Sequence, residues 1–191
     1  AGPGPPPDPE PTAVAPAAAT DPFADARETY EDTCAPCHGA DGSGSVKGPQ
    51  ILHPVDGYAA HVVRAGRDEM AEYPDPMPKF AAADLSDADL QAVFAWLASS
   101  PKPEDGKGLF LRYCGNCHGP LGDGGRTGRD AAHEAHDGDA KVLKWIRKGH
   151  GGTDYNNRRE YMPAWTAEQI TDADASKIAE SKYIIFSNKG E

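Results

Sequence analysis

Apolar residues recur with a helical period near the middle of the chain and again near its end. The first set follows the spacing i, i+3, i+4, i+7 of one buried helix face and comprises Leu90, Val93, Phe94 and Leu97. The preceding Ser86-Asp87-Ala88-Asp89 has the form of a capping box, so we expect a helix to begin there. Thr171-Asp172-Ala173-Asp174 repeats this start, and Ile178 then matches Val93.

A series of elements leads up to each of these helices, in the same order in both halves of the chain. Asp21-Pro22 has the form of an N-cap followed by proline at the first helical position, which predicts a helix that carries Tyr30. A short amphipathic helix from Gly57 should end at Gly66. In the second half, Phe110 takes the place of Tyr30. The second middle helix and the glycine that ends it comprise Val142, Trp145, Ile146 and Gly149.

This internal duplication predicts an all-α fold built from two tandem helical domains. Before them, the chain is almost entirely proline, alanine, glycine and acid, a composition typical of an extended tether. Such a tether would hold the domains away from a membrane anchor or a partner, and a dispensable tail is the alternative. The predicted parts are the tether (1–20), the first domain (21–100), a linker (101–105) and the second domain (106–191).

The composition limits the classes of function. A formal net charge of −11 argues against nucleic-acid binding, which needs basic patches, and favours partners with basic docking faces. The alternative is that the acidity only keeps an exported protein soluble. No run of 18 or more apolar residues occurs, so we predict no membrane span within this chain. No leader segment is evident either, and we expect a mature chain whose leader has been removed, which leaves open whether an N-terminal anchor was removed with it.

All four cysteines lie in two copies of one pentapeptide, Cys34-Ala-Pro-Cys37-His38 and Cys114-Gly-Asn-Cys117-His118. Cys-x-x-Cys-His is the attachment signature of c-type haem. Residues i and i+3 share one helix face, so both thiols can reach the vinyl groups of one porphyrin while the next histidine points at its iron. We therefore predict two covalently bound haem c groups. Structural zinc and a redox disulfide are the alternatives, but zinc ribbons place their cysteine pairs within ~15–20 residues of each other.

Each domain carries one Met-Pro pair between its haem motif and its last helix, Met77-Pro78 and Met162-Pro163. A thioether is a soft ligand that suits haem iron, and the proline stiffens the loop. We predict that both methionines are sixth ligands, with core packing as the alternative for each. Met70 has no counterpart in the second domain. Histidine is the competing ligand type, and the candidates are His53, His61, His133, His136 and His150.

Two arginines also repeat, Arg64 and Arg147, each two residues before the glycine that ends the middle helix. They could pair with haem propionates through charge-assisted hydrogen bonds. They could equally be solvated cations that favour a helix C-terminus. The sequence leaves both interpretations open.

The order of these motifs resembles the class I cytochrome c domain, and two such domains in tandem resemble the dihaem cytochromes c of bacterial respiratory chains. The resemblance covers residues 22–191 and implies a helical fold wrapped around each haem. It also implies that partners dock at the exposed haem edge. The implied iron ligands are His38 with Met77 in the first domain and His118 with Met162 in the second.

The resemblance extends to the surroundings of the iron ligands. Gly48-Pro49-Gln50-Ile51-Leu52 matches the family's Gly-Pro-x-x-Leu stretch, which implies that the Pro49 carbonyl accepts the second N–H of the axial histidine. The second domain has Gly128-Arg129 at the matching place, so its histidine needs another acceptor. It also spaces its two ligands more widely. The aromatic pairs implied where the first and last helices cross are Tyr30 with Trp96 and Phe110 with Tyr183.

We expect an electron-transfer protein rather than an enzyme, because iron with protein ligands on both sides has no open position for a substrate. Methionine–histidine ligation raises the reduction potential, which suits the oxidising end of a respiratory or photosynthetic chain. The predicted location is the periplasm or the outer face of a bacterial membrane. The alternative is a dihaem enzyme, peroxidase-like or sulfur-oxidising, with an open iron in the second domain if Met162 does not bind. A fixed subunit of a larger complex is a third interpretation.

Overall fold

The computed structural model describes residues 2, 21–68, 73, 75–128, 131 and 139–181. Within these ranges the regular secondary structure is helical, and the extended pairings are isolated bridges, so the predicted all-α fold is confirmed. Several segments and residues singled out in the sequence lie outside the described ranges: nearly all of the predicted tether (1–20), Met70, Arg129, His133, His136 and Tyr183.

The first module contains α1 (Ala24–Thr33), α2 (Ala35–His38), α3 (Asp56–Ala65) and α4 (Asp87–Ala98). Helix α1 packs against α4, and the rings of Tyr30 and Trp96 meet there with their centroids 4.7 Å apart, as the resemblance implied. The Tyr30 side chain is fully buried, and its hydroxyl donates to the Gly39 carbonyl at 2.6 Å. The predicted apolar face of α4 is buried: Leu90, Val93, Phe94 and Leu97.

The second module contains α5 (Gly106–Tyr113), α6 (Gly115–His118), α8 (Asp139–Lys148) and α9 (Asp172–Glu180). Helix α9 packs against both α5 and α8. A Cβ on Gly106 would collide with the backbone carbonyl of Lys177, so only glycine permits this approach of α5 to α9. The buried core residues are Leu109, Phe110, Ile146, Trp165, Ile170, Ala175 and Ile178.

The last helix of each module begins at the predicted cap. The Ser86 hydroxyl accepts the backbone N–H of Asp89 at 3.1 Å. Thr171 and Asp174 form a complete capping box, in which each side chain accepts the other's backbone N–H at 3.1 Å. These caps satisfy N–H groups that have no partner within the helix, so the local sequence is sufficient to fix both starts.

The predicted start of the first helix is wrong. Helix α1 begins at Ala24, and its N-cap is Phe23 instead of Asp21. The Asp21 carboxylate instead accepts the N–H of Phe23 at 2.9 Å and binds Arg27 at 2.6 Å. The segment Asp21-Pro22 therefore forms a turn that leads into the helix, because a carboxylate can bond the backbone two residues on as readily as it can cap a helix.

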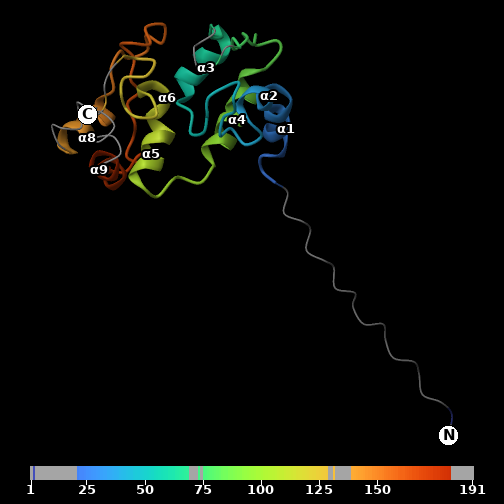
Figure 1. Ribbon diagram of the computed structural model, residues 1–191. Helices are drawn as coiled ribbons and strands as arrows, with labels where there is room; N and C mark the ends of the chain where they lie inside the picture. Colours follow the sequence, from blue (N-terminus) through green and yellow to red (C-terminus); the bar gives the residue numbers. More distant parts are fainter. Residues whose placement is uncertain are drawn as a thin grey trace.

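The two modules lie side by side, and α3 lies on the side of the first module that faces the second (Figure 1). Two contacts join the segment between the modules to α9. Lys102 Nζ lies 3.0 Å from Asp174 Oδ2, and Lys177 Nζ donates to the Glu104 carbonyl at 3.0 Å. Burial opposes ionisation of Asp174, but hydrogen bonds from Lys102 and Thr171 hold its pKa below the ordinary value. In the part of the chain that the structure describes, no helix combines the length and apolarity needed to span a membrane.

Candidate haem-binding sites

Each Cys-x-x-Cys-His motif forms a single helical turn, α2 or α6, directly after a longer helix. Its first cysteine is the C-cap of that longer helix. The backbone N–H of the motif's histidine donates to the carbonyl of this cysteine, at 2.9 Å for His38 and Cys34 and at 3.0 Å for His118 and Cys114. The turn places both thiols of a motif on one face. None of the four cysteines is in a disulfide.

The surroundings of Cys34, Cys114 and Cys117 favour neutral thiols. Burial raises the pKa of Cys34 to about 11 and that of Cys114 to about 12. Burial also raises the pKa of Cys117, although nearby arginines oppose it. Zinc would need several deprotonated ligands together, and the described residues contain no group of three or more His, Cys, Asp or Glu side chains placed to hold a metal ion. The donors therefore fit a porphyrin joined through its vinyl groups better than they fit zinc.

The Pro49 carbonyl fixes the orientation of the His38 ring. The carbonyl oxygen lies 2.8 Å from His38 Nδ1, so Nδ1 is the donor and Nε2 is the nitrogen that could bind a metal ion. Burial lowers the pKa of His38, which favours the neutral imidazole that binds metals. A Cβ on Gly48 would lie 3.2 Å from two atoms of the His38 ring, so the glycine lets this loop approach the ligand closely.

The loop after the second motif closes differently from the loop after the first. The Cys117 carbonyl accepts the backbone N–H groups of Arg126 and Thr127, at 3.0 and 3.2 Å. The Cys37 carbonyl instead accepts the hydroxyl of Ser45 at 2.6 Å. In the second module, backbone N–H groups of the loop thus take the place of the serine hydroxyl as donors to the cysteine carbonyl. This difference agrees with the second module's lack of the Gly-Pro-x-x-Leu stretch.

Met77 and Met162 have the same backbone environment. Each forms a two-hydrogen-bond antiparallel bridge with the residue after the glycine that ends the middle helix. Met77 pairs with Arg67 at 2.9 and 3.0 Å, and Met162 pairs with His150 at 3.0 and 2.8 Å. The two methionines therefore occupy equivalent positions in their modules, although the loops that precede them differ in length.

The aromatic residue after each Met-Pro pair forms a further backbone hydrogen bond, which joins the loop to the middle helix. The backbone N–H of Phe80 donates to the carbonyl of Val63 at 3.1 Å. The N–H of Trp165 donates to the carbonyl of Ile146 at 2.8 Å, at the equivalent position of α8. Each Met-Pro pair is thus held on one side by the residue after the glycine that ends the middle helix, and on the other by the middle helix itself.

The glycine that ends each middle helix also makes room for the methionine segment. Gly66 and Gly149 have φ values of 72° and 59°, as a residue after a helix C-terminus often does. A Cβ on Gly66 would lie 2.8 Å from the Met77 carbonyl oxygen, and one on Gly149 would lie 2.6 Å from that of Met162. The positive φ and the close approach of the methionine carbonyl both require glycine. The close approach cannot be predicted from the local sequence.

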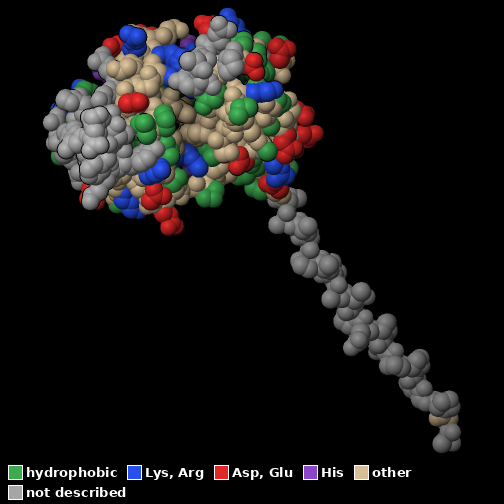
Figure 2. All heavy atoms as spheres, in the orientation of Figure 1, with side chains coloured by type: hydrophobic (Ala, Val, Ile, Leu, Met, Phe, Trp, Pro, Cys, Tyr) green, Lys and Arg blue, Asp and Glu red, His purple; other side chains and the backbone are tan. Residues whose placement is uncertain are grey.

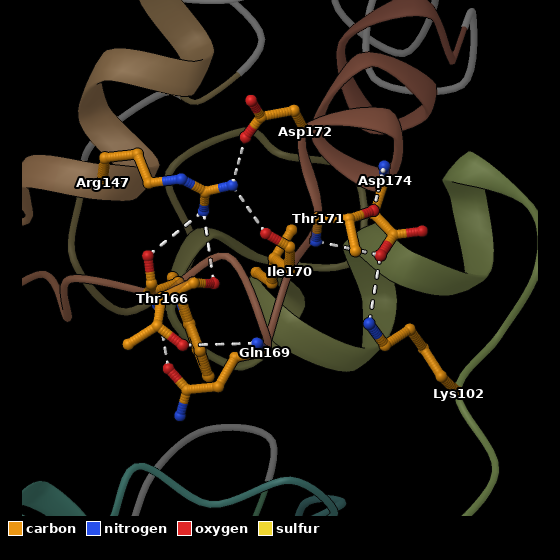
Figure 3. A network of polar contacts seen from close by, with 9 residues as sticks. Lys102, Arg147, Thr166, Gln169, Ile170, Thr171, Asp172 and Asp174 are labelled. Atoms are coloured by element: carbon orange, nitrogen blue, oxygen red, sulfur yellow. Dashed lines mark hydrogen bonds and ion pairs between the residues drawn. The ribbon is translucent and has the colours of Figure 1, made fainter.

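Arg147 connects the loop that follows Met162 to the last helix, α9 (Figure 3). Its Nη2 lies 2.7 Å from the carbonyl oxygen of Ile170 and 2.6 Å from Asp172 Oδ1, at the start of α9. Its Nη1 lies 3.1 Å from the carbonyl oxygen of Trp165. One guanidinium thus joins α8, the loop after Met162 and α9.

Arg64 makes the equivalent contacts in the first module. Its guanidinium donates to the Phe80 carbonyl at 2.9 Å and to the Asp87 carboxylate, at the start of α4, at 2.5 Å. The structure therefore gives both arginines a role that the sequence did not suggest. They connect the middle helix, the loop after the methionine and the start of the last helix.

Replacing Arg147 by alanine is expected to lower the free energy of unfolding by about 2–3 kcal/mol, because it leaves partly buried carbonyls without a donor. Arg64→Ala is the matched variant, because Arg64 has fewer backbone acceptors. We expect it to lower the free energy of unfolding by about 1 kcal/mol. The Asp172 side chain is 73% exposed, so its ion pair contributes little of the difference. Denaturant unfolding of the haem-loaded chain measures both losses, and equal losses would contradict this account of the carbonyls.

The competing histidines that the structure describes lie in two kinds of surroundings. The His150 ring is half-exposed. The His53 ring lies 5.2 Å from that of Tyr113, and the His61 ring lies 5.6 Å from that of Tyr155, centroid to centroid. His53 and His61 thus belong to the contact between the two modules.

The modules also meet beside the two haem motifs, a contact that sequence reasoning missed. Gln50 Nε2 donates to the Arg112 carbonyl at 2.8 Å, and Asn116 Nδ2 donates to the Gln50 carbonyl at 2.6 Å. Gln50 follows the Pro49 carbonyl that binds His38, and Asn116 lies inside the second motif. A groove of about 520 Å³ lies between these segments. The paired residues are 62 and 66 positions apart, so no local pattern points to them.

Two tandem helical modules, each with a Cys-x-x-Cys-His turn and an equivalently held methionine, define a c-type cytochrome. The family described as cytochrome c oxidase, cbb3-type, subunit III matches residues 21–97 and 101–180, and the chain belongs to this family. Membership confirms the predicted tandem c-type cytochrome, and the family implies covalently attached haem c.

The relatives found by comparison are distant. The chain is 28% identical over 165 residues to the Cbb3-type cytochrome c oxidase subunit FixP of Azorhizobium caulinodans, which covers 74% of this chain and 53% of FixP. The chain thus spans about half the length of this curated relative. Among solved structures it is similar to the Kuenenia stuttgartiensis reducing HAO-like protein complex Kustc0457/Kustc0458, with 17% identity, a TM-score of 0.32, and 86% of this chain and 95% of that chain covered. That likeness is too weak to carry an argument.

Proposed function

We propose that this chain binds two haem c groups, one in each module, and carries electrons one at a time between redox partners. The observation that carries the proposal is the repeated bridge that gives Met77 and Met162 the same position relative to the middle helix. The proposed attachment residues are Cys34, Cys37, Cys114 and Cys117, and the proposed iron ligands are His38, Met77, His118 and Met162. Once bound, haem iron supplies the reversible one-electron change.

The protein's own residues hold the ligands in place. The Pro49 carbonyl orients His38, and the two methionine bridges position the sulfur ligands. Arg64 and Arg147 stabilise the loops that carry the methionines. We propose the domain division that the duplication predicted, with a first domain at 21–100, a linker at 101–105 and a second domain at 106–191.

The proposed role is electron transfer without catalysis, since a protein ligand on each side of both irons leaves no open position. The name of FixP as a subunit of a cytochrome c oxidase supports an oxidase complex as the partner. We propose a membrane respiratory complex, with this chain as its subunit or its electron donor. The proposed location is the periplasm or the outer face of a bacterial membrane, where haem c is attached.

The surface of the first module supports a partner with a basic docking face. Helix α1 exposes Asp25, Glu28, Glu31 and Asp32. Acidic side chains gather at the edge of the molecule where Figure 1 places α1, as Figure 2 shows. Attraction to such a surface fades beyond about 8–10 Å at cellular salt, so it would steer and orient a partner at close range.

The haem count tests the proposal directly. The mass of the denatured chain should exceed its sequence mass by two haem groups, and a pyridine haemochrome assay should give two haems per chain. The variant Cys114→Ser/Cys117→Ser should retain one covalent haem, since it removes both thioether bonds of the second site. A chain with one haem in its unaltered form, or a bound zinc ion, would contradict the proposal.

A further inference from the structure

The segments that carry the two methionines meet across the module boundary. The ring of Tyr58, on α3 of the first module, stacks on the ring of Tyr161 of the second, with centroids 4.8 Å apart and planes 23° apart. Tyr161 directly precedes Met162 and is 9% exposed. Tyr161, the residue before the second methionine, is therefore packed against a side chain of the first module.

Tyr58 also contacts the segment that pairs with the first methionine. Arg67 Nη2 lies 3.4 Å from the Tyr58 hydroxyl oxygen, and the Arg67 guanidinium carbon lies 5.7 Å from the centre of the Tyr58 ring. The backbone of Arg67 forms the bridge with Met77. One ring thus contacts the neighbours of both methionines.

Tyr155 completes what we call the tyrosine cluster, which comprises Tyr58, Tyr155 and Tyr161. The Tyr155 ring meets Tyr161 edge to face at 5.1 Å and Tyr58 at 5.9 Å. A Cβ on Gly57 would lie 2.5 Å from the Tyr155 hydroxyl oxygen, so the missing side chain of Gly57 admits Tyr155 to α3. The cluster therefore fixes the second module's loop against a helix of the first.

We propose that Tyr58 is a positioning residue for Met162, so that the first module helps to hold the sixth ligand of the second haem iron. The inference rests on the proposed role of Met162 as that ligand. His150, just after the end of α8, holds Met162 through their backbone bridge, and the tyrosine cluster holds the preceding residue from the opposite module. Without the Tyr58 ring, one face of Tyr161 loses its packing partner and the loop gains conformational freedom that opposes ligation.

Four substitutions in the haem-loaded full chain test this inference. Tyr58→Leu should weaken the near-infrared sulfur-to-iron charge-transfer band by up to about half, since one of two sites would lose its methionine. It should also lower one of the two reduction potentials and leave the other nearly unchanged. Tyr58→Phe keeps the stacked ring and loses only the hydroxyl contact with Arg67, so both readouts should stay close to those of the unaltered chain.

Gly57→Ala tests the same contact with every atom of the cluster retained. Alanine has a higher helix propensity than glycine, so loss of folding is not expected. Its Cβ should push Tyr155 away from α3 and change the band and the potential in the same direction as Tyr58→Leu, by a smaller amount.

Met162→Ala identifies which potential belongs to the second site and separates the two proposals. If Met162→Ala changes the band and one potential while Tyr58→Leu and Gly57→Ala change neither, the positioning role of Tyr58 is wrong and the ligand remains. If Met162→Ala itself changes nothing, the ligand assignment fails, and the inference fails with it. A lower unfolding temperature with an intact band and intact potentials would reduce Tyr58 to a packing residue and overturn the inference.

Discussion

Replacing Met162 by alanine is expected to lower one of the two reduction potentials and to leave the other nearly unchanged. The identity of the axial ligands sets haem potentials over a range of about 0.8 V, and a thioether sulfur favours the reduced iron. Loss of the sulfur leaves water, or a weaker protein ligand, at that position. Potentiometric titration followed at a visible absorption band of the haem measures both potentials in one experiment.

The matched variant is Met77→Ala, which should lower the other potential for the same reason. Both methionines are held by the same kind of bridge, so we expect the two variants to resemble each other in direction and size. Met70→Ala serves as the control, because Met70 has no counterpart in the repeat. The band from sulfur to iron should halve in either ligand variant and persist in the control. Titration curves that do not change in Met162→Ala would remove Met162 from this role, and carbon monoxide binding to the unaltered reduced chain would point to an open iron.

Replacing Gly149 by alanine is expected to produce a large loss of stability, of about 2–5 kcal/mol, together with damage to the second methionine site. The backbone at Gly149 has a φ of 59°, which costs an L-residue about 1–2 kcal/mol. The added Cβ would also lie 2.6 Å from both the Met162 carbonyl oxygen and the Ala164 nitrogen. These are backbone atoms that cannot rotate away, so the Met162 segment must shift at an overpacking cost of about 1–3 kcal/mol.

Gly152→Ala separates these two costs. Gly152 has nearly the same φ, 58°, but a Cβ there meets nothing within 4 Å. This variant should therefore lose only about 1–2 kcal/mol and keep the sulfur-to-iron band. Denaturant unfolding and the near-infrared spectrum measure both effects. If the two variants were equally destabilised, the close approach of Met162 to Gly149 would have no energetic importance.

Local sequence patterns predicted most of the elements of this fold because short-range interactions fix them. The cap residues Ser86 and Thr171 satisfy N–H groups within their own helix turn, so three or four residues suffice to mark each start. Asp21 shows the limit of such patterns. The same carboxylate can cap a helix or close a turn before it, and its contacts with Phe23 and Arg27 selected the turn.

The roles of the repeated arginines could not be predicted from the sequence. Arg64 and Arg147 occur at matching places in the duplication, which singled them out but left their role open. Their acceptors are mostly backbone carbonyls from 16 to 23 residues away, and every residue type has a carbonyl. No sequence pattern can therefore identify such a partner.

The sequence by itself predicted the chemistry of the chain and its repetition, because the attachment motif of c-type haem has a fixed short spacing. It also determined the helices that carry these groups, through apolar period and caps. Only the tertiary structure decided how the two modules meet, through Gln50 with Asn116 and Tyr58 with Tyr161. Those contacts join residues far apart in the chain, and they depend on shape and on backbone groups that the order of residue types does not encode.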